Sequence, residues 1–217
     1  MQLLNIAVSF FQEGGIFMYP IVLVLAIGLT IAIERYLHLS AASYANQKVW
    51  RLSMDALSRR DFKQALGISQ QSNTAIGRIL AYGLERSKSA GRRDDIETAM
   101  EEGLMEALPR LERRTHYLAI FANISTLLGL LGTIIGLIQA FTAVAAANPT
   151  EKADMLSASI SVAMNTTAFG LMVAIPLLLI HALLQTKTTE LVDSLEMATV
   201  KFLNIIGDAS ALRSPAK

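Results

Sequence analysis

Side chains that could handle protons or ions recur along two long apolar stretches of the sequence. Residues 118–146 carry hydroxyl and small side chains that share one helical face: Thr126, Gly129, Thr133 and Gly136. Residues 156–184 carry a similar face: Ser159, Ala163, Thr166 or Thr167, and Gly170, with Asn165 beside it. A hydroxyl-lined interior can pass protons or ions along, but the same residues can also tie helices together in lipid. The residue pattern alone leaves both readings open.

The spacing of the glycines in these two stretches predicts close helix packing, and a proline predicts a kink. Gly132 and Gly136 form a GxxxG pair, and small residues of this kind let helix backbones approach closely in a membrane. We therefore expect Gly129, Gly132, Gly136 and Gly170 to serve helix packing. Pro176 lies inside the third apolar stretch, where we expect it to kink the helix.

Charged residues are absent from the stretches that must position these side chains. No Asp, Glu, Lys or Arg occurs in residues 14–33, 115–150 or 155–186. About 20 apolar residues are enough to cross a bilayer. We expect an all-α membrane protein with transmembrane helices at residues 16–34, 118–146 and 156–184. The second and third are longer than a crossing requires, so they should extend into a cytoplasmic helical domain.

The distribution of basic residues predicts the orientation of these helices. Basic residues follow the first span and precede the second, namely Arg35, Lys48, Arg51, Arg110, Arg113 and Arg114. We expect residues 1–15 and the short loop 147–155 to lie outside. Residues 35–117 and the C-terminal helix and tail at 185–217 should lie inside. The first apolar stretch has no basic residue before it, which favours a retained anchor over a cleaved signal peptide.

Composition excludes several function classes. The chain of 217 residues has no cysteine, 17% charged residues and a net charge of +1. These values exclude disulfides and cysteine-ligated metals and give no support for nucleic-acid binding. We find no catalytic triad, phosphate-binding loop or metal cluster, so we expect neither an enzyme nor a cofactor. Because no acid lies in mid-membrane, a proton relay would need an acidic group from another polypeptide.

The polar segment between the first two spans contains residues that mark where helices begin and end. Arg59–Asp61 predicts a tight turn with Asp61 as an N-cap, and residues 87–93 predict a loop. Asp94 or Asp95 should cap a helix that begins near Ile96, and Pro109 should kink that helix.

An apolar stripe continues beyond the third span. It consists of Leu191, Leu195, Ala198, Phe202 and Ile205. Water should surround this part of the chain, so the stripe needs a partner: the chain's own helices or another copy.

Three motifs resemble the MotA/TolQ/ExbB proton channel family, most closely its ExbB/TolQ branch. Leu128–Leu137 resembles the signature of the second span, and Thr167–Pro176 resembles that of the third. Glu34–Arg35, after the first span, also matches. The order, spacing and topology agree along nearly the whole chain.

The resemblance implies a homopentamer in the bacterial inner membrane with its N-terminus in the periplasm. Two copies of an ExbD- or TolR-like single-span protein would occupy the pore and supply an Asp that carries protons. The proton-motive force would then drive work on a TonB- or TolA-like protein.

By motif position, Thr133 and Thr167 match the family's pore threonines. We expect the ion pathway also to include Thr126, Ser159, Asn165 and Thr166. The apolar tail stripe would pack between subunits.

The sequence departs from the ExbB/TolQ pattern in the third span. Val162 stands where a glutamate is common, and Asn165 and Thr166 stand where small apolar residues are usual. The Thr166–Thr167 pair is closer to the flagellar-stator branch, whereas three spans favour ExbB/TolQ. The alternatives are therefore a flagellar- or gliding-type stator driven by H⁺ or Na⁺, or a non-conducting membrane scaffold.

Overall fold

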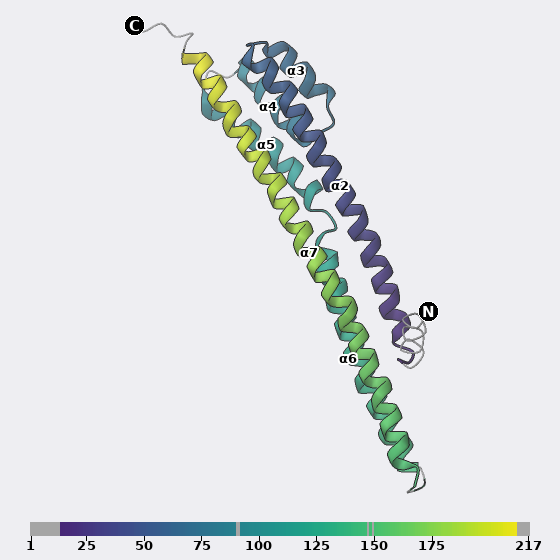
Figure 1. The fold of residues 1–217 in the computed structure, drawn as a ribbon. Coiled ribbons are helices and arrows are strands. Elements are labelled where there is room, and N and C mark those ends of the chain that lie inside the picture. The colour runs from purple at the N-terminus through teal and green to yellow at the C-terminus, as the bar shows by residue number, and fades with distance from the viewer. Residues whose placement is uncertain (1–13, 90–91, 147, 149, 212–217) are drawn as a thin grey trace, which may run out of the picture. The chain divides into compact units, whose positions relative to one another are not determined.

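The described secondary structure of the chain is entirely α-helical. A computed structural model describes residues 14–89, 92–146, 148 and 150–211. Its helices, shown in chain order in Figure 1, are α2 (Met18–Ser58), α3 (Phe62–Gln71), α4 (Ala75–Ser89), α5 (Arg93–Glu112), α6 (His116–Ala146) and α7 (Lys152–Ala211). The predicted all-α class is confirmed for the described residues.

Three helical stretches are long and apolar enough to cross a membrane, as expected. They are Met18–Ser58, Arg93–Ala145 and Lys152–Gly207. The second stretch combines α5 and α6, and its apolar part lies in α6. At about 1.5 Å per residue, the 60 residues of α7 greatly exceed a hydrocarbon core of roughly 30 Å. The later helices are therefore extended, as the sequence predicted.

The helices group into two compact units. Unit 1 contains the described part of Met1–Glu34 together with Arg114–Leu183, and unit 2 contains Arg35–Arg113 with the chain from Leu184 onward. Unit 1 exposes many large apolar side chains, including Leu127 at 62% and Leu183 at 71%. Lipid tails are as apolar as leucine, so such exposure carries little penalty in a bilayer.

Unit 2 has a core of its own, and the apolar tail stripe belongs to it. α4 packs against α3 and α5. Leu191, Leu195, Ala198 and Phe202 of α7 are buried within the chain. A Cβ atom at Gly83 of α4 would lie 2.9 Å from the Phe202 ring, which shows how closely the two helices approach. The expectation that the stripe packs between subunits is therefore wrong, because helices of the same chain already cover it.

The turn between α2 and α3 forms as predicted. The backbone N–H of Arg60 donates to the Leu57 carbonyl and that of Asp61 to the Ala56 carbonyl, each at 2.9 Å. Arg60 has a positive φ of 59°, so this is a Schellman end to α2. The Asp61 carboxylate then accepts from the Gln64 N–H at 2.9 Å. The predicted N-cap is confirmed.

The start of α5 differs from the expectation. Arg92 is its N-cap residue, and Asp94 and Asp95 lie in its first turn. They interact favourably there with the positive end of the helix dipole without capping it, so the predicted cap is wrong. The helix contains Pro109 and ends at Glu112, and Arg114 follows with a positive φ of 67°.

Candidate functional site

The site begins with a close approach of α6 and α7 within unit 1. A Cβ atom at Gly129 would lie 3.2 Å from the Cα of Thr167 and 3.3 Å from the Cα of Gly170. A Cβ atom at Gly170 would lie 2.8 Å from the Ser125 carbonyl oxygen. Only glycine allows backbones to pass at this distance. Gly129 and Gly170 therefore set the separation of the two helices.

Ser125 adds a buried hydrogen bond to this contact. Its hydroxyl donates to the Gly170 carbonyl at 3.0 Å, and the side chain is fully buried. Ser125 was not among the predicted site residues. The available signal was its position four residues before Gly129 and eight before Thr133, which places it on the same face of α6.

Thr133 and Thr167 meet directly beside the glycine contact. Their Oγ1 atoms are 3.2 Å apart. The Thr167 hydroxyl also lies 2.8 Å from the Gly129 carbonyl, and the Thr133 hydroxyl lies 2.6 Å from the Leu130 carbonyl. Each hydroxyl has one proton and two acceptor lone pairs. With both protons donated, the pair retains acceptor capacity and is suited to receive a proton donor or a cation.

The two hydroxyls are only half-buried, so another group can reach them. They carry no charge. The stretches of α6 and α7 around them contain no Asp, Glu, Lys or Arg. The pair can therefore orient a proton or an ion but cannot itself hold a proton in exchange with water.

Thr166 has different neighbours from Thr167. It is 2% exposed, and its hydroxyl lies 2.5 Å from the Gly14 carbonyl and 3.0 Å from the Val162 carbonyl. A Cβ atom at Gly132 would come against the Thr166 side chain. The structure thus places Thr166 against α6 and the turn before α2, away from the Thr133–Thr167 pair.

The remaining predicted site residues are more dispersed. Thr126 donates to the Ala122 carbonyl of its own helix at 3.2 Å. Ser159 and Asn165 are half-exposed on α7, and Pro176 is exposed within the same helix. Gly136 packs against Ala163, whose Cβ would lie 2.9 Å from an added Cβ. The structure therefore brings Thr133, Thr167, Gly129 and Gly170 together, with Ser125 as an addition.

The Glu34–Arg35 motif contacts the segment that joins α5 to α6. Within unit 1, the carboxylate of Glu34 lies 3.7 Å from the guanidinium of Arg114, and both side chains are partly exposed. Within unit 2, Arg35 is 2% exposed and donates to the Leu111 carbonyl, near the C-terminal end of α5. The carbonyls at a helix C-terminus favour such a cation.

Comparison with known proteins places these features in a family. Residues 71–197 match the MotA/TolQ/ExbB proton channel family. A putative biopolymer transport protein, ExbB-like 1, from Synechocystis sp. is 31% identical over 84% of this chain and 72% of its own length. The biopolymer transport protein exbB1 of Vibrio cholerae is 27% identical over 94% of this chain and 90% of its own length. A putative ExbB homologue from Methanothermobacter thermautotrophicus is 25% identical over 86% of this chain.

Proposed function

This chain belongs to the MotA/TolQ/ExbB proton channel family, and we propose that it is the ExbB-type subunit of an ion-driven membrane motor. The observation that carries the proposal is the contact of the Thr133 and Thr167 hydroxyls at 3.2 Å, beside the glycines that draw α6 and α7 together. The subunit has no enzymatic role in this proposal. It forms the stationary wall of a pore.

The moving charge comes from a partner in this proposal. Neither α6 nor α7 has a carboxylate near the hydroxyl pair. A single-span ExbD- or TolR-like protein supplies an Asp, and the hydroxyl pair accepts a hydrogen bond from its protonated form. Repeated protonation from one side and release on the other turns the proton-motive force into work on a TonB- or TolA-like protein.

The proposed assembly is a homopentamer around a partner dimer in the bacterial inner membrane. The half-exposed hydroxyls of each subunit then face an interior instead of lipid, where unsatisfied polar groups are unfavourable. The N-terminus lies in the periplasm and unit 2 in the cytoplasm, in agreement with the basic residues on either side of the first two spans.

Ion flux in liposomes tests this function. We expect flux only when the chain is reconstituted with its single-span partner. Leaving the O–H of the protonated Asp without this acceptor costs about 1–3 kcal/mol, which corresponds to a roughly five- to hundredfold slower step. Thr167→Ala should therefore reduce flux by at least about fivefold, whereas Thr167→Ser keeps the hydroxyl and should retain most of it. Measurement in Na⁺-free buffer distinguishes H⁺ from Na⁺.

Thr142→Ala is the matched control. Thr142 is exposed on α6, and its hydroxyl bonds only to its own helix, at the Ile138 carbonyl. This variant should conduct normally. Full flux in Thr167→Ala would contradict the role given to the hydroxyl pair. No flux with the partner, in a pentamer verified by native mass spectrometry, would favour a non-conducting scaffold.

A further inference from the structure

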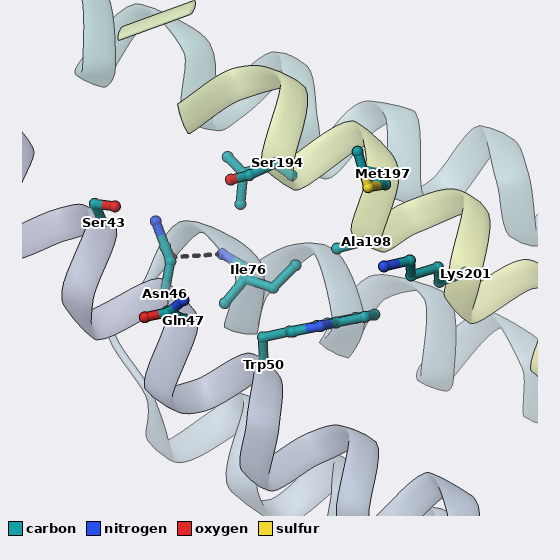
Figure 2. Close-up of a pocket in the computed structure, with 10 residues that line it drawn as sticks. Ser43, Asn46, Gln47, Trp50, Ile76, Ser194, Met197, Ala198 and Lys201 are labelled. Carbon is teal, nitrogen blue, oxygen red and sulfur yellow. Dashed lines mark hydrogen bonds between the residues drawn. The ribbon is translucent and has the colours of Figure 1, made fainter. Parts of the chain in front are cut away.

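A pocket within unit 2 has features that the proposed motor function does not use. It lies between α2, α4 and α7 and has a volume of about 270 Å³. Its walls include Asn46, Trp50, Ile76, Ser194, Met197 and Lys201 (Figure 2). Pockets for drug-sized ligands span roughly 300–1,000 Å³. This pocket is therefore suited to a smaller molecule.

The pocket offers a flat aromatic surface. Figure 2 shows the Trp50 indole lying along one side of the pocket, beneath Ile76 and Ala198. Met197 contributes a thioether to the pocket lining from α7. Aromatic rings stack favourably on an indole face, and methionine sulfur makes favourable contacts with aromatic rings. Trp50 and Met197 therefore favour a ligand with a planar aromatic ring.

The pocket also offers a positive charge. Lys201 is the one charged side chain among the described lining residues, and Figure 2 shows its ammonium directed toward the pocket. None of the ion pairs formed by the described residues includes Lys201. An anion in the pocket would have a cation to pair with and no carboxylate lining to repel it.

Asn46 supplies an amide donor to the lining of the pocket. The residue is 5% exposed, and its Oδ1 accepts from the Ile76 N–H at 3.1 Å. That bond defines the orientation of the amide, so the Nδ2 group must be the other end. Figure 2 shows Nδ2 turned away from Ile76. Among the hydrogen bonds of the described residues, Asn46 makes only the bond to Ile76. Nδ2 is therefore free to donate to an acceptor held in the pocket.

We propose that this pocket binds a small aromatic carboxylate. The ring stacks on Trp50, and the carboxylate accepts hydrogen bonds from Asn46 Nδ2 and Lys201 Nζ. One ligand would then contact α2 and α7 at once and join these two helices within unit 2. This site is separate from the Thr133–Thr167 pair, so its occupancy would regulate or stabilise unit 2 without entering the ion path.

Trp50 itself reports on the site, because it is the only tryptophan in the chain. Benzoate added to the purified full-length protein should change the Trp50 fluorescence, excited at 295 nm, in a saturable way. Benzyl alcohol, which has the same ring and no charge, should bind at least about tenfold more weakly, because it lacks the charge-assisted hydrogen bonds. Equal responses to the two compounds, or no saturable response to benzoate, would overturn the proposal.

Two variants separate binding from folding. Asn46→Asp keeps an acceptor for the Ile76 N–H and places a negative charge near the N-terminus of α4, which preserves the local fold. It removes both amide donors, so benzoate affinity should fall by at least about tenfold. Lys201→Gln should produce a loss of similar size. Lys63→Gln makes the same charge change at an exposed residue of α3, outside the pocket, and should leave affinity unchanged.

A second copy of this chain could instead occupy the pocket. In that case Trp50 emission would change when the assembly dissociates on dilution, and benzoate would have no effect at any protein concentration. That result would overturn the small-molecule site. Wild-type affinity in both Asn46→Asp and Lys201→Gln would also refute it.

Discussion

The hydroxyls of Thr166 and Thr167 are adjacent in sequence and have different neighbours. Thr167 faces Thr133 and the Gly129 carbonyl, whereas Thr166 is buried against the Gly14 and Val162 carbonyls. Successive residues of a helix point about 100° apart, so one of two adjacent threonines can serve a pore while the other serves packing. We therefore expect substitutions at Thr166 to affect stability first and those at Thr167 to affect ion movement first.

Tyr82 lies in a cluster of charged side chains in unit 2, and this cluster shifts the pKa of its hydroxyl. The Tyr82 hydroxyl donates to Glu106 Oε2 at 3.0 Å. The other oxygen of Glu106 accepts from Arg78 and Arg110, each at 3.1 Å. The hydrogen bond to Glu106, followed by its negative charge and by burial, raises the pKa of Tyr82 above its ordinary value of 10.0.

This shift predicts a pH dependence of stability. Because the folded-state pKa of Tyr82 is raised, its stabilising effect is complete below about pH 10 and is lost as the pH rises through the folded-state value. Tyr82→Phe should therefore be slightly less stable than wild type at pH 8, and the difference should shrink above pH 10. Denaturant unfolding followed by circular dichroism at several pH values would measure this. Tyr44→Phe, at a side chain 74% exposed, is the control, and a difference that grew with pH would contradict the assignment.

At the scale of elements, α6 and α7 can approach closely because glycine has no Cβ atom. Around Gly170, the nearest atoms to an added Cβ are backbone atoms: the Ser125 carbonyl oxygen at 2.8 Å and the Gly129 Cα at 3.1 Å. Backbone cannot move aside as the end of a flexible side chain can. The helices must separate to admit even one methyl group, and the Ser125–Gly170 and Thr167–Gly129 hydrogen bonds would lengthen together.

Gly170→Ala should therefore destabilise the protein and impair conduction. Overpacking of this kind costs about 1–3 kcal/mol, which detergent-mediated unfolding of the purified protein would measure. Flux should fall in parallel, because Thr167 moves with the α7 backbone. Gly67→Ala is the matched control, since nothing lies within 4 Å of its added Cβ. It should be neutral or stabilise α3 by up to about 1 kcal/mol. Similar losses in both variants would refute the packing argument.

At the scale of the whole molecule, the two units have different surfaces and therefore suit different surroundings. Unit 1 holds the hydroxyl pair between helices whose outer faces are apolar. Unit 2 buries its own core, including Phe202 and Met100 at 0% exposure, and carries most of the charged residues. A bilayer suits the first unit and water suits the second. The tail stripe needs no second subunit to be covered, so we expect contacts between subunits to involve other surfaces.

The proposed orientation can be tested cleanly, because the chain has no cysteine. Single cysteines at Thr150, between α6 and α7, and at Ser89, at the end of α4, would be the only thiols. In spheroplasts, a membrane-impermeant maleimide should label Thr150→Cys and leave Ser89→Cys unlabelled until the membrane is permeabilised. The reverse pattern would show that the basic residues flanking the spans do not set the topology.

The sequence by itself determined the helical class, the number of membrane-crossing stretches and the Asp61 cap. A membrane-crossing stretch is recognised from the summed hydrophobicity of consecutive residues, and an N-cap depends on residues within one helical turn. Both can therefore be predicted from a short segment of sequence. The small-residue faces and the family motifs were also visible without a structure. They identified the helices that carry the candidate site and most of its proposed residues.

Only the tertiary structure decided which of these residues meet. The pairing of Thr133 with Thr167, the bond from Ser125 to Gly170, the burial of Thr166 and the covering of the tail stripe all depend on how helices distant in sequence are rotated against each other. A step of one residue turns a side chain by about 100°. The periodicity of the sequence can therefore predict which residues share a face of a helix. Which other helix packs against that face is decided only by the tertiary structure.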